Sequence, residues 1–189
     1  MDQPDLIPRY AGFWPRLGAA LIDGLIWLPL LPLSVWGEHK FRLFDVYRSI
    51  PLTVLTVWYS VYLVYRFGGT PGKLLLGLQI TELDGGPITA RAAILRYLPE
   101  FILATLVGIA VFVPLLAMSD EQYATISSSF MGRAQYLLAN APSWYRPVNV
   151  LYMLWFWGEF LVLLTNRKRR ALHDFIAGTV VIHRKVHES

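Results

Sequence analysis

Residues 101–119 read FILATLVGIAVFVPLLAMS, a run of 19 residues without a charged side chain. A helix of about 20 apolar residues, rising about 1.5 Å per residue, spans the hydrocarbon core of a bilayer. Similar runs occur at Leu17–Trp36, Ser49–Tyr65 and Pro147–Asn166; the first contains Asp23 and the last contains Glu159. The sequence therefore predicts an all-α integral membrane protein with four transmembrane helices.

The composition of the whole chain agrees with a membrane location. Of its 189 residues, 55% are hydrophobic and 16% are charged, whereas soluble domains carry about 45–50% and about 25%. There is no cysteine, which excludes disulfides, thiolate nucleophiles and cysteine-ligated metals. A net charge of +4 would suggest nucleic-acid binding in a soluble protein, but here we attribute it to loops that face anionic lipid and expect no nucleic-acid partner.

Lys and Arg residues lie unevenly on the two sides of the predicted spans. Four spans place both termini on one side, and that side holds twelve of the 17 Lys and Arg residues. Because cytoplasmic loops are enriched in these residues, we expect both termini in the cytoplasm. The expected protein is a multi-pass protein of the inner or plasma membrane, a single domain over residues 1–189 with a basic cytoplasmic tail at 167–189.

The segment between the second and third spans, Arg66–Glu100, is more than a plain loop. Within it, LLLGLQITELDGG predicts a strand-like or interfacial run before a Gly-Gly turn, and PITARAAILRYLPE predicts an amphipathic helix at the cytoplasmic interface. The apolar run at 175–182 predicts a strand or a segment lying on the bilayer. Six basic residues are expected to bind lipid headgroups: Arg91, Arg96, Arg167, Lys168, Arg169 and Arg170.

Asp23 is the first of two acidic residues at membrane depth. It lies seven residues into the first span, or about 10 Å, where a carboxylate costs on the order of 2.5–3.5 kcal/mol and must face protein, water or a cation. Arg16, seven residues earlier, lies on the same helix face. Two interpretations remain open: Arg16 binds headgroups while Asp23 pairs with a polar group in the bundle, or Asp23 belongs to a polar or ion pathway.

Glu159 is the second membrane acid, and its depth from the cytoplasmic side matches that of Asp23. If the two carboxylates met across the bundle, mutual repulsion would favour binding of a proton or a cation, which is the chemistry of proton-coupled exchange. In the alternative, Glu159 accepts a hydrogen bond from an indole or the backbone.

Other motifs that carry chemistry are absent from the sequence. The stretch Gly68–Lys73 resembles part of a phosphate loop but lacks two required residues. The residue before it is Phe67 where the motif requires glycine, and the residue after it is Leu74 where the motif requires Ser or Thr. The four histidines lack metal-site spacing, and we find no pair of nucleophile and base. We therefore expect no enzyme, no cofactor and no bound metal.

Three stretches, in order, carry a family resemblance: AGFWPRLGAALIDGLI at 11–26, GGTPGKLLLGLQITELDGG at 68–86 and RRALHDFIAGTVVI at 169–182. Together they resemble the RDD family of small multi-span membrane proteins, over nearly the whole chain apart from residues 120–146. The family is named for an arginine at the start of the first helix, an aspartate within it and a second aspartate further on. The resemblance implies that these are Arg16, Asp23 and Asp174.

The resemblance implies membrane transport or an accessory role in a membrane complex. RDD proteins are described as uncharacterised or as candidate transporters; monovalent cation/proton antiport has been attributed to some members, and others are accessory parts of membrane complexes. We therefore expect a membrane transporter that moves Na⁺, K⁺ or H⁺, in which Asp23 binds the ion or proton. Glu159 is not one of the name-giving residues, and its matching depth alone predicts that it shares that site.

The remaining charged residues near the cytoplasmic boundary are Arg16, His173 and Asp174, and we expect them to form a gate or structural lock if the tail folds back onto the first helix. Because four helices are few for alternating access, a homo-oligomer or a partner membrane subunit is expected. The alternative is a non-transporting scaffold or accessory subunit, in which the charged residues hold the helices and the basic tail together.

Overall fold

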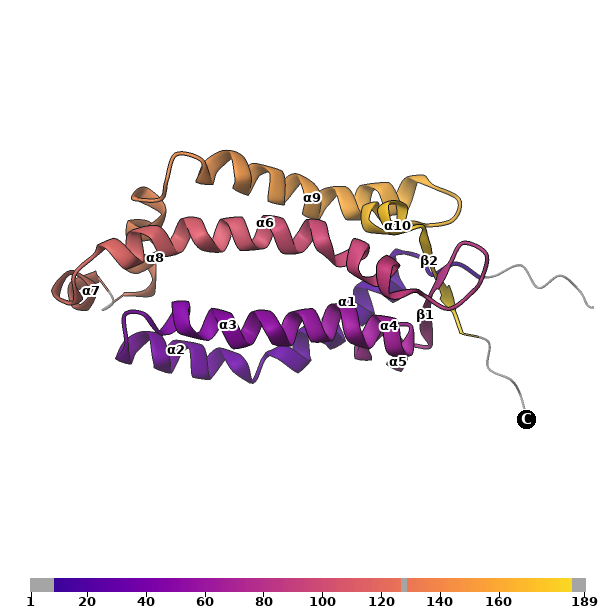
Figure 1. Ribbon diagram of the computed structural model, residues 1–189, viewed down its shortest axis with the longest axis horizontal. Helices are drawn as coiled ribbons and strands as arrows, with labels where there is room; N and C mark the ends of the chain where they lie inside the picture. Colours follow the sequence, from indigo (N-terminus) through magenta and orange to yellow (C-terminus); the bar gives the residue numbers. More distant parts are fainter. Residues whose placement is uncertain (1–8, 127–128, 185–189) are drawn as a thin grey trace, which may run out of the picture. The chain divides into compact units, whose positions relative to one another are not determined.

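The protein is mostly helical in a computed structural model that describes residues 9–126 and 129–184 (Figure 1); the tail residues 185–189, predicted to be basic and cytoplasmic, lie outside this description. Within the described part, three helical segments are long and apolar enough to cross a membrane, or up to four if a bent pair counts as one span. These are the continuous segment α3 (Phe44–Val57), η1 (Trp58–Tyr62) and α4 (Leu63–Phe67), the helices α6 (Ala90–Ala117) and α9 (Tyr145–Thr165), and the bent pair α1 (Phe13–Trp27) and α2 (Leu30–Lys40).

The first predicted span is interrupted where α1 ends and α2 begins. The two helices are bent by 46° at this break, which contains Leu28 and Pro29. Proline has no N–H to donate, and its ring crowds the preceding helical turn. The backbone N–H of Leu31 instead donates to the carbonyl of Leu28 at 3.0 Å, in a tight turn. The predicted span Leu17–Trp36 is therefore two helices rather than one.

The start of α6 also differs from the prediction. The amphipathic helix expected before the third span and the span itself form one helix of 28 residues. Pro99 lies inside this helix, at the point where the sequence suggested a boundary. A proline removes one helical hydrogen bond, but it does not end α6.

Contacts divide the chain into two compact units, and each is described by itself. Unit 1 comprises the described residues of Met1–Ile26, Val57–Leu98 and Phe156–Ser189. It contains α5 (Pro71–Leu75), α10 (Leu172–Ala177) and the two-stranded antiparallel sheet of β1 (Leu78–Glu82) and β2 (Thr179–His183). Thus the fold is not purely helical.

The small sheet ties three distant parts of unit 1 together. Leu78 pairs with His183 and Glu82 pairs with Thr179, and Figure 1 shows the two strands side by side. The amino-terminal segment lies along β2, because the N–H of Ala11 donates to the carbonyl of Val181 at 2.8 Å. The strand expected in the middle connector is β1, and the apolar run of the tail supplies β2.

Gly178 explains how the chain passes from α10 directly into β2. Its φ of 69° lies in the left-handed region, which glycine adopts without steric cost and which commonly ends helices. The core beneath the sheet consists of buried apolar side chains: Ala11, Ala19, Val64, Leu78, Ile80, Ile88, Ala92, Ala93 and Val181.

Unit 2 comprises the described residues of Trp27–Thr56 and Pro99–Trp155, including α7 (Asp120–Ile126) and α8 (Phe130–Ala139). Its core contains Leu115, Met118, Tyr123 and Leu137. Ion pairs stabilise the loops: Arg42 binds Asp120 at 2.6 Å, and Arg133 pairs with Glu38.

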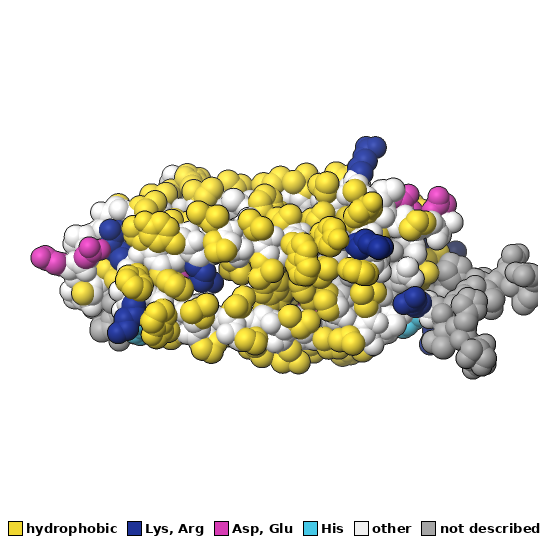
Figure 2. All heavy atoms as spheres, turned by 60° about the horizontal axis from the view of Figure 1, so that its bottom comes forward, with side chains coloured by type: hydrophobic (Ala, Val, Ile, Leu, Met, Phe, Trp, Pro, Cys, Tyr) yellow, Lys and Arg dark blue, Asp and Glu magenta, His cyan; other side chains and the backbone are white. Residues whose placement is uncertain are grey.

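The surface of the long helices is strongly apolar. Hydrophobic side chains cover much of the face in Figure 2. On α9, Leu154, Trp157, Leu161 and Leu164 are 61–64% exposed. Large exposed apolar surfaces indicate burial in lipid or against protein. Together, the exposed apolar side chains and the long apolar helices are typical of a multi-pass membrane protein.

Candidate functional site

Asp174 is the centre of a buried polar cluster in unit 1. Its side chain is 0% exposed. One carboxylate oxygen, Oδ2, accepts hydrogen bonds from Nη1 of Arg16 at 2.7 Å and from the N–H of Ala171 at 3.0 Å. The other, Oδ1, pairs with Arg96 and accepts from the hydroxyl of Thr179 at 3.2 Å. Two guanidinium groups therefore compensate one buried carboxylate, as burial of a charge requires.

The charge state of Asp174 follows from these partners. Burial by itself would raise the pKa of Asp174, but the positive charges of Arg96 and Arg16 lower that pKa well below its usual range. Asp174 is therefore ionised over the whole physiological pH range, and its ion pairs are permanent.

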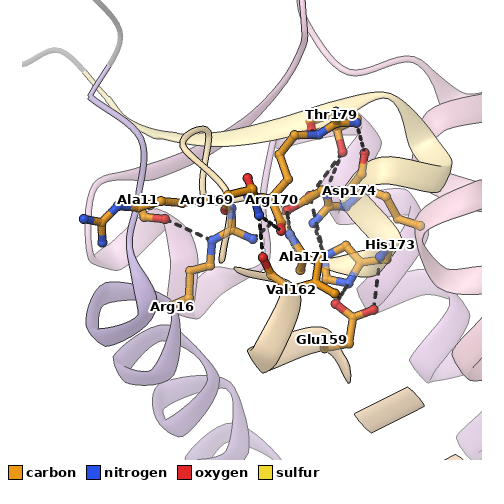
Figure 3. Close-up of polar contacts among 12 residues, drawn as sticks. Ala11, Arg16, Glu159, Val162, Arg169, Arg170, Ala171, His173, Asp174 and Thr179 are labelled. Carbon is orange, nitrogen blue, oxygen red and sulfur yellow. Dashed lines mark hydrogen bonds and ion pairs between the residues drawn. The ribbon is translucent and has the colours of Figure 1, made fainter. Parts of the chain in front are cut away.

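Arg16 connects α1 to the tail through several contacts. Besides Asp174, its guanidinium donates to the carbonyl of Arg169 at 2.7 Å and to that of Ala11 at 3.3 Å, as Figure 3 shows. The tail thus folds back onto the first helix, and the contact between Arg16 and Asp174 that the sequence left open is formed.

His173 joins Arg96 to Glu159. Its Nε2 lies 2.8 Å from a guanidinium nitrogen of Arg96, and its Nδ1 lies 2.6 Å from Oε2 of Glu159. The N–H of His173 also donates to Oε1 of Glu159 at 3.1 Å (Figure 3). Since arginine only donates hydrogen bonds, Nε2 accepts one and Nδ1 carries the proton that faces the carboxylate.

Two of the six basic residues expected at lipid headgroups face the protein instead. Arg96 is only 8% exposed, and it lies on the face of α6 that carries the buried Ala92 and Ala93. Arg91, five residues earlier, points about 140° away and is exposed. Arg170 is partly buried and lies 4.1 Å above the ring of Phe175. Three further basic residues are exposed: Arg167, Lys168 and Arg169.

Asp23 has a separate set of partners in unit 1. Its Oδ1 accepts hydrogen bonds from the hydroxyl of Tyr59 at 2.5 Å and from the N–H of Gly72 at 2.7 Å. Its Oδ2 accepts from the hydroxyl of Thr70 at 2.6 Å. Pro71 is the first residue of α5, where a missing N–H needs no partner. Asp23 therefore caps the next free amide of α5 from a different helix.

Gly72 allows this close approach. A Cβ on Gly72 would overlap the backbone oxygen of Ala19 and lie 2.8 Å from the carboxyl carbon of Asp23. Any larger residue would push α5 away from α1. The glycine that resembles part of a phosphate loop thus has a packing role.

Lys73 lies between the Asp23 and Asp174 clusters. It is half-buried, and its Nζ is 3.5 Å from the hydroxyl oxygen of Thr70, which in turn donates to Asp23. Burial and the positive charges of Arg96 and Arg16 lower the pKa of Lys73 to about 8, against an opposing effect of Asp23 and Asp174. Lys73 is therefore a cation that can lose its proton close to neutral pH.

The predicted site residues thus form two groups. Arg16, His173, Asp174 and Glu159 belong to one cluster, whereas Asp23 binds the segment that begins α5. Asp23 and Glu159, which we expected to share a site, have different hydrogen-bonding partners in the described structure.

Sequence reasoning missed the residues around Asp23: Tyr59, Thr70 and Lys73. A signal was available in Thr70-Pro71, which is typical of a helix start. It indicates a free amide that needs an acceptor, but it does not identify the acceptor, because Asp23 lies 49 residues from Gly72.

This chain shares sequence similarity with known proteins. A sequence model of the RDD family matches residues 10–178. The uncharacterized protein YckC of Bacillus subtilis (strain 168) is 33% identical over 94 residues, a match that covers 48% of this chain and 58% of that relative. No solved structure matches the chain. Because the family match covers most of the chain, including Arg16, Asp23 and Asp174, the protein belongs to the RDD family.

Proposed function

We propose that this protein is a membrane transporter that exchanges a monovalent cation, Na⁺ or K⁺, bound at Asp23 for a proton released by Lys73. The observation that carries the proposal is the position of Lys73. Its ammonium, with a pKa of about 8, lies 3.5 Å from the hydroxyl of Thr70, which is itself bonded to Asp23. A group that readily gives up a proton is therefore connected to the carboxylate of Asp23 through two hydrogen bonds, with the hydroxyl of Thr70 between them.

The ligands around Asp23 suit a hard cation. The hydroxyl oxygens of Tyr59 and Thr70 lie 2.5 Å and 2.6 Å from the two carboxylate oxygens of Asp23, and hard cations prefer oxygen ligands. When a cation binds, the two hydroxyl protons turn away and their oxygens face the ion. The amide of Gly72 keeps its hydrogen bond and holds Asp23 in place.

The exchange is balanced in charge. With Lys73 protonated, its positive charge offsets that of Asp23. When Lys73 releases its proton to water, the carboxylate loses that compensation, and one monovalent cation restores it. Return of the proton to Lys73 expels the cation. One proton is therefore exchanged for one cation at this site.

In this proposal the Asp174 cluster is the structural lock or gate. Arg16, His173 and Asp174 link α1, α6, α10 and the end of α9 through hydrogen bonds of charged groups, so separating these segments would expose several unpaired charges at once. We further propose a location in the cell membrane with both termini in the cytoplasm, and a homo-oligomer or partner subunit that completes the transport path.

The proposal is tested with purified protein in liposomes that contain a pH-sensitive dye. A pH gradient is imposed, and Na⁺ or K⁺ is then added outside. We expect the wild-type protein to dissipate the gradient in response to at least one of these ions. Asp23→Asn abolishes the response. Asp84→Asn removes an exposed carboxylate of the same size and leaves the response unchanged.

A binding measurement separates loss of transport from loss of folding. In weakly buffered detergent solution, addition of the transported cation to the wild-type protein releases protons near pH 8, and Lys73→Gln abolishes this release without lowering the melting temperature. Absence of cation-dependent flux and of proton release in the folded wild-type protein would overturn the proposal. The polar clusters would then support the alternative, a scaffold or accessory subunit.

A further inference from the structure

Unit 1 contains a cavity of about 320 Å³ at the end of α9, and in the described structure none of its lining residues contacts Asp23 or Asp174 through a side-chain hydrogen bond. Its lining combines apolar and cationic side chains: Phe13, Leu163, Leu164, Asn166, Arg167 and Arg169. Among the residues that the structure describes, none in the lining is acidic. A cavity of this kind suits a ligand that is apolar at one end and anionic at the other.

The loop that carries the two arginines is fixed in shape. Nδ2 of Asn166 donates to the carbonyl of Val162 at 2.5 Å and to that of Arg170 at 2.7 Å, while Oδ1 of Asn166 accepts from the N–H of Arg170 at 2.8 Å. The loop thus closes on itself immediately after the helix, and the cavity wall is formed before any ligand arrives.

Arg169 adopts a backbone conformation that is unusual for its residue type. Its φ is 48°, in the left-handed region, which is sterically unfavourable for a residue with a Cβ. Strained conformations of this kind cluster at functional sites, where the surrounding structure enforces them. Here the carbonyl of Arg169 is held by Arg16 at 2.7 Å, and Arg169 is one of the residues that line the cavity.

We propose that this cavity binds an anionic phospholipid, with Arg167 and Arg169 at the phosphate and Phe13, Leu163 and Leu164 against the first part of the acyl chains. The guanidinium fork matches phosphate oxygens with two parallel hydrogen bonds. Leu164 and Leu161, 64% and 63% exposed, continue the apolar surface along α9 away from the cavity. An acyl chain can follow this surface, and a free phosphate ion would not use it.

Lys168 provides a matched control, because it is exposed and lies between the two arginines in sequence but does not line the cavity. The purified protein is titrated in neutral detergent micelles with dioleoyl phosphatidylglycerol, and the bound lipid is counted by native mass spectrometry. We expect Arg167→Gln and Arg169→Gln each to weaken binding at least tenfold. Lys168→Gln should weaken it less than twofold.

Two further ligands identify the source of the phosphate. Dioleoyl phosphatidylcholine, which carries no net charge, should bind at least tenfold more weakly than phosphatidylglycerol. Inorganic phosphate at millimolar concentration should not displace the lipid, and Leu164→Gln should weaken lipid binding because it interrupts the acyl-chain path. Each variant is first checked for an unchanged melting temperature in lipid-free detergent, and Arg167→Lys serves as a second, conservative variant with partial binding.

Three results would overturn the proposal. An equal loss in Lys168→Gln and Arg167→Gln would indicate a diffuse basic surface. Equal binding of the two lipids would exclude charge recognition. Complete displacement by inorganic phosphate would indicate a site for the free anion. None of these measurements involves cation transport, so they stand or fall independently of the exchange at Asp23.

Discussion

Nδ1 of His173 lies 2.6 Å from Oε2 of Glu159, and the backbone N–H of the same histidine donates to Oε1 at 3.1 Å. The carboxylate of α9 therefore holds both the ring and the backbone at the first turn of α10. Because Nε2 faces Arg96 at 2.8 Å, the ring is fixed between an acceptor and a donor.

The first prediction concerns the tautomer of His173. Its two partners require the proton on Nδ1, since a guanidinium cannot accept a hydrogen bond. Long-range ¹H–¹⁵N correlation spectra of protein labelled at histidine should show this tautomer at neutral pH. Glu159→Gln should shift the Nδ1 signal of His173 but not that of His39, whose Nδ1 contacts the carbonyl of Val35. A proton on Nε2 of His173 would contradict the arrangement.

The second prediction concerns the stability provided by Asp174. Asp174→Asn leaves Arg16 and Arg96 without their common carboxylate, and removing one partner of a buried ion pair costs about 3–5 kcal/mol. Asp84→Asn at the exposed turn after β1 should change the free energy of unfolding by less than about 0.5 kcal/mol. Unfolding in mixed micelles with increasing sodium dodecyl sulfate measures both. Equal values for the two variants would show that the cluster adds nothing to stability.

The stability difference between the wild-type protein and Asp174→Asn should also depend on pH, and the direction of this dependence can be predicted. The folded state lowers the pKa of Asp174 below its usual value, so its stabilising contribution is fully present above about pH 4, the ordinary pKa of an aspartate. As pH falls below that value, the unfolded chain takes up a proton that the folded state does not, and the contribution declines. The stability difference between wild type and Asp174→Asn should therefore shrink between about pH 4 and the lowest pH at which the protein is folded. A difference independent of pH would exclude this linkage.

Gly72 provides a third prediction, on the packing of α5 against α1. Gly72→Ala places a methyl group against the backbone oxygen of Ala19, and backbone cannot move aside as a flexible side chain would. We expect a loss of about 1–3 kcal/mol, typical of overpacking, together with loss of the hydrogen bond from Gly72 to Asp23. Gly24→Ala is the control, because a Cβ there meets no atom within 4 Å, and alanine should stabilise α1 by about 0.5–1 kcal/mol. A neutral effect at Gly72 would contradict the tight contact.

Local sequence patterns predicted the apolar helices because these depend on neighbouring residues. At both strands the patterns left two alternatives, a strand or a segment at the membrane surface, and the structure has strands. The apolar run at 101–119 lies in α6 (Ala90–Ala117) except for its last two residues, which follow the helix. The strand-like stretch before the Gly-Gly turn contains β1. Helix boundaries were less accurate, because a proline at Pro29 accompanies a break in the helix while one at Pro99 does not. Which proline breaks a helix depends on the surrounding packing, and that information is not local.

The hydrogen-bonding partners of the buried charged residues could be predicted only in part, because they too depend on packing between segments that are distant in sequence. The resemblance to a known family identified Arg16, Asp23 and Asp174, and the side chains of Arg16 and Asp174 meet. Equal depth suggested that Asp23 would meet Glu159, but depth fixes only one coordinate. The direction of a side chain around its helix is a second one, and Asp23 faces the start of α5 while Glu159 faces α10.

The last prediction concerns Lys73. Both the effect of this residue on the free energy of unfolding and the proposed exchange depend on the proton of its ammonium group. The folded state lowers the pKa of Lys73 from its ordinary 10.5 to about 8, so between these values the unfolded chain binds a proton that the folded state does not. Stability contributed by this residue therefore rises with pH from about 8 to about 10.5. Below pH 8 the folded state carries the full cost of a half-buried ammonium, at most about 3 kcal/mol.

Lys73→Met should accordingly be more stable than wild type at pH 7, and the two proteins should converge above pH 10, whereas Lys40→Met at the exposed end of α2 should show no such convergence. The measurement is the free energy of unfolding of the three proteins at pH 7, 8, 9 and 10. If Lys73 also supplies the exchanged proton, cation-dependent flux in liposomes should rise over the same pH range in which this stability difference declines. A stability difference that is constant with pH would show that Lys73 does not titrate in this range, and it would remove the proton donor from the proposed exchange.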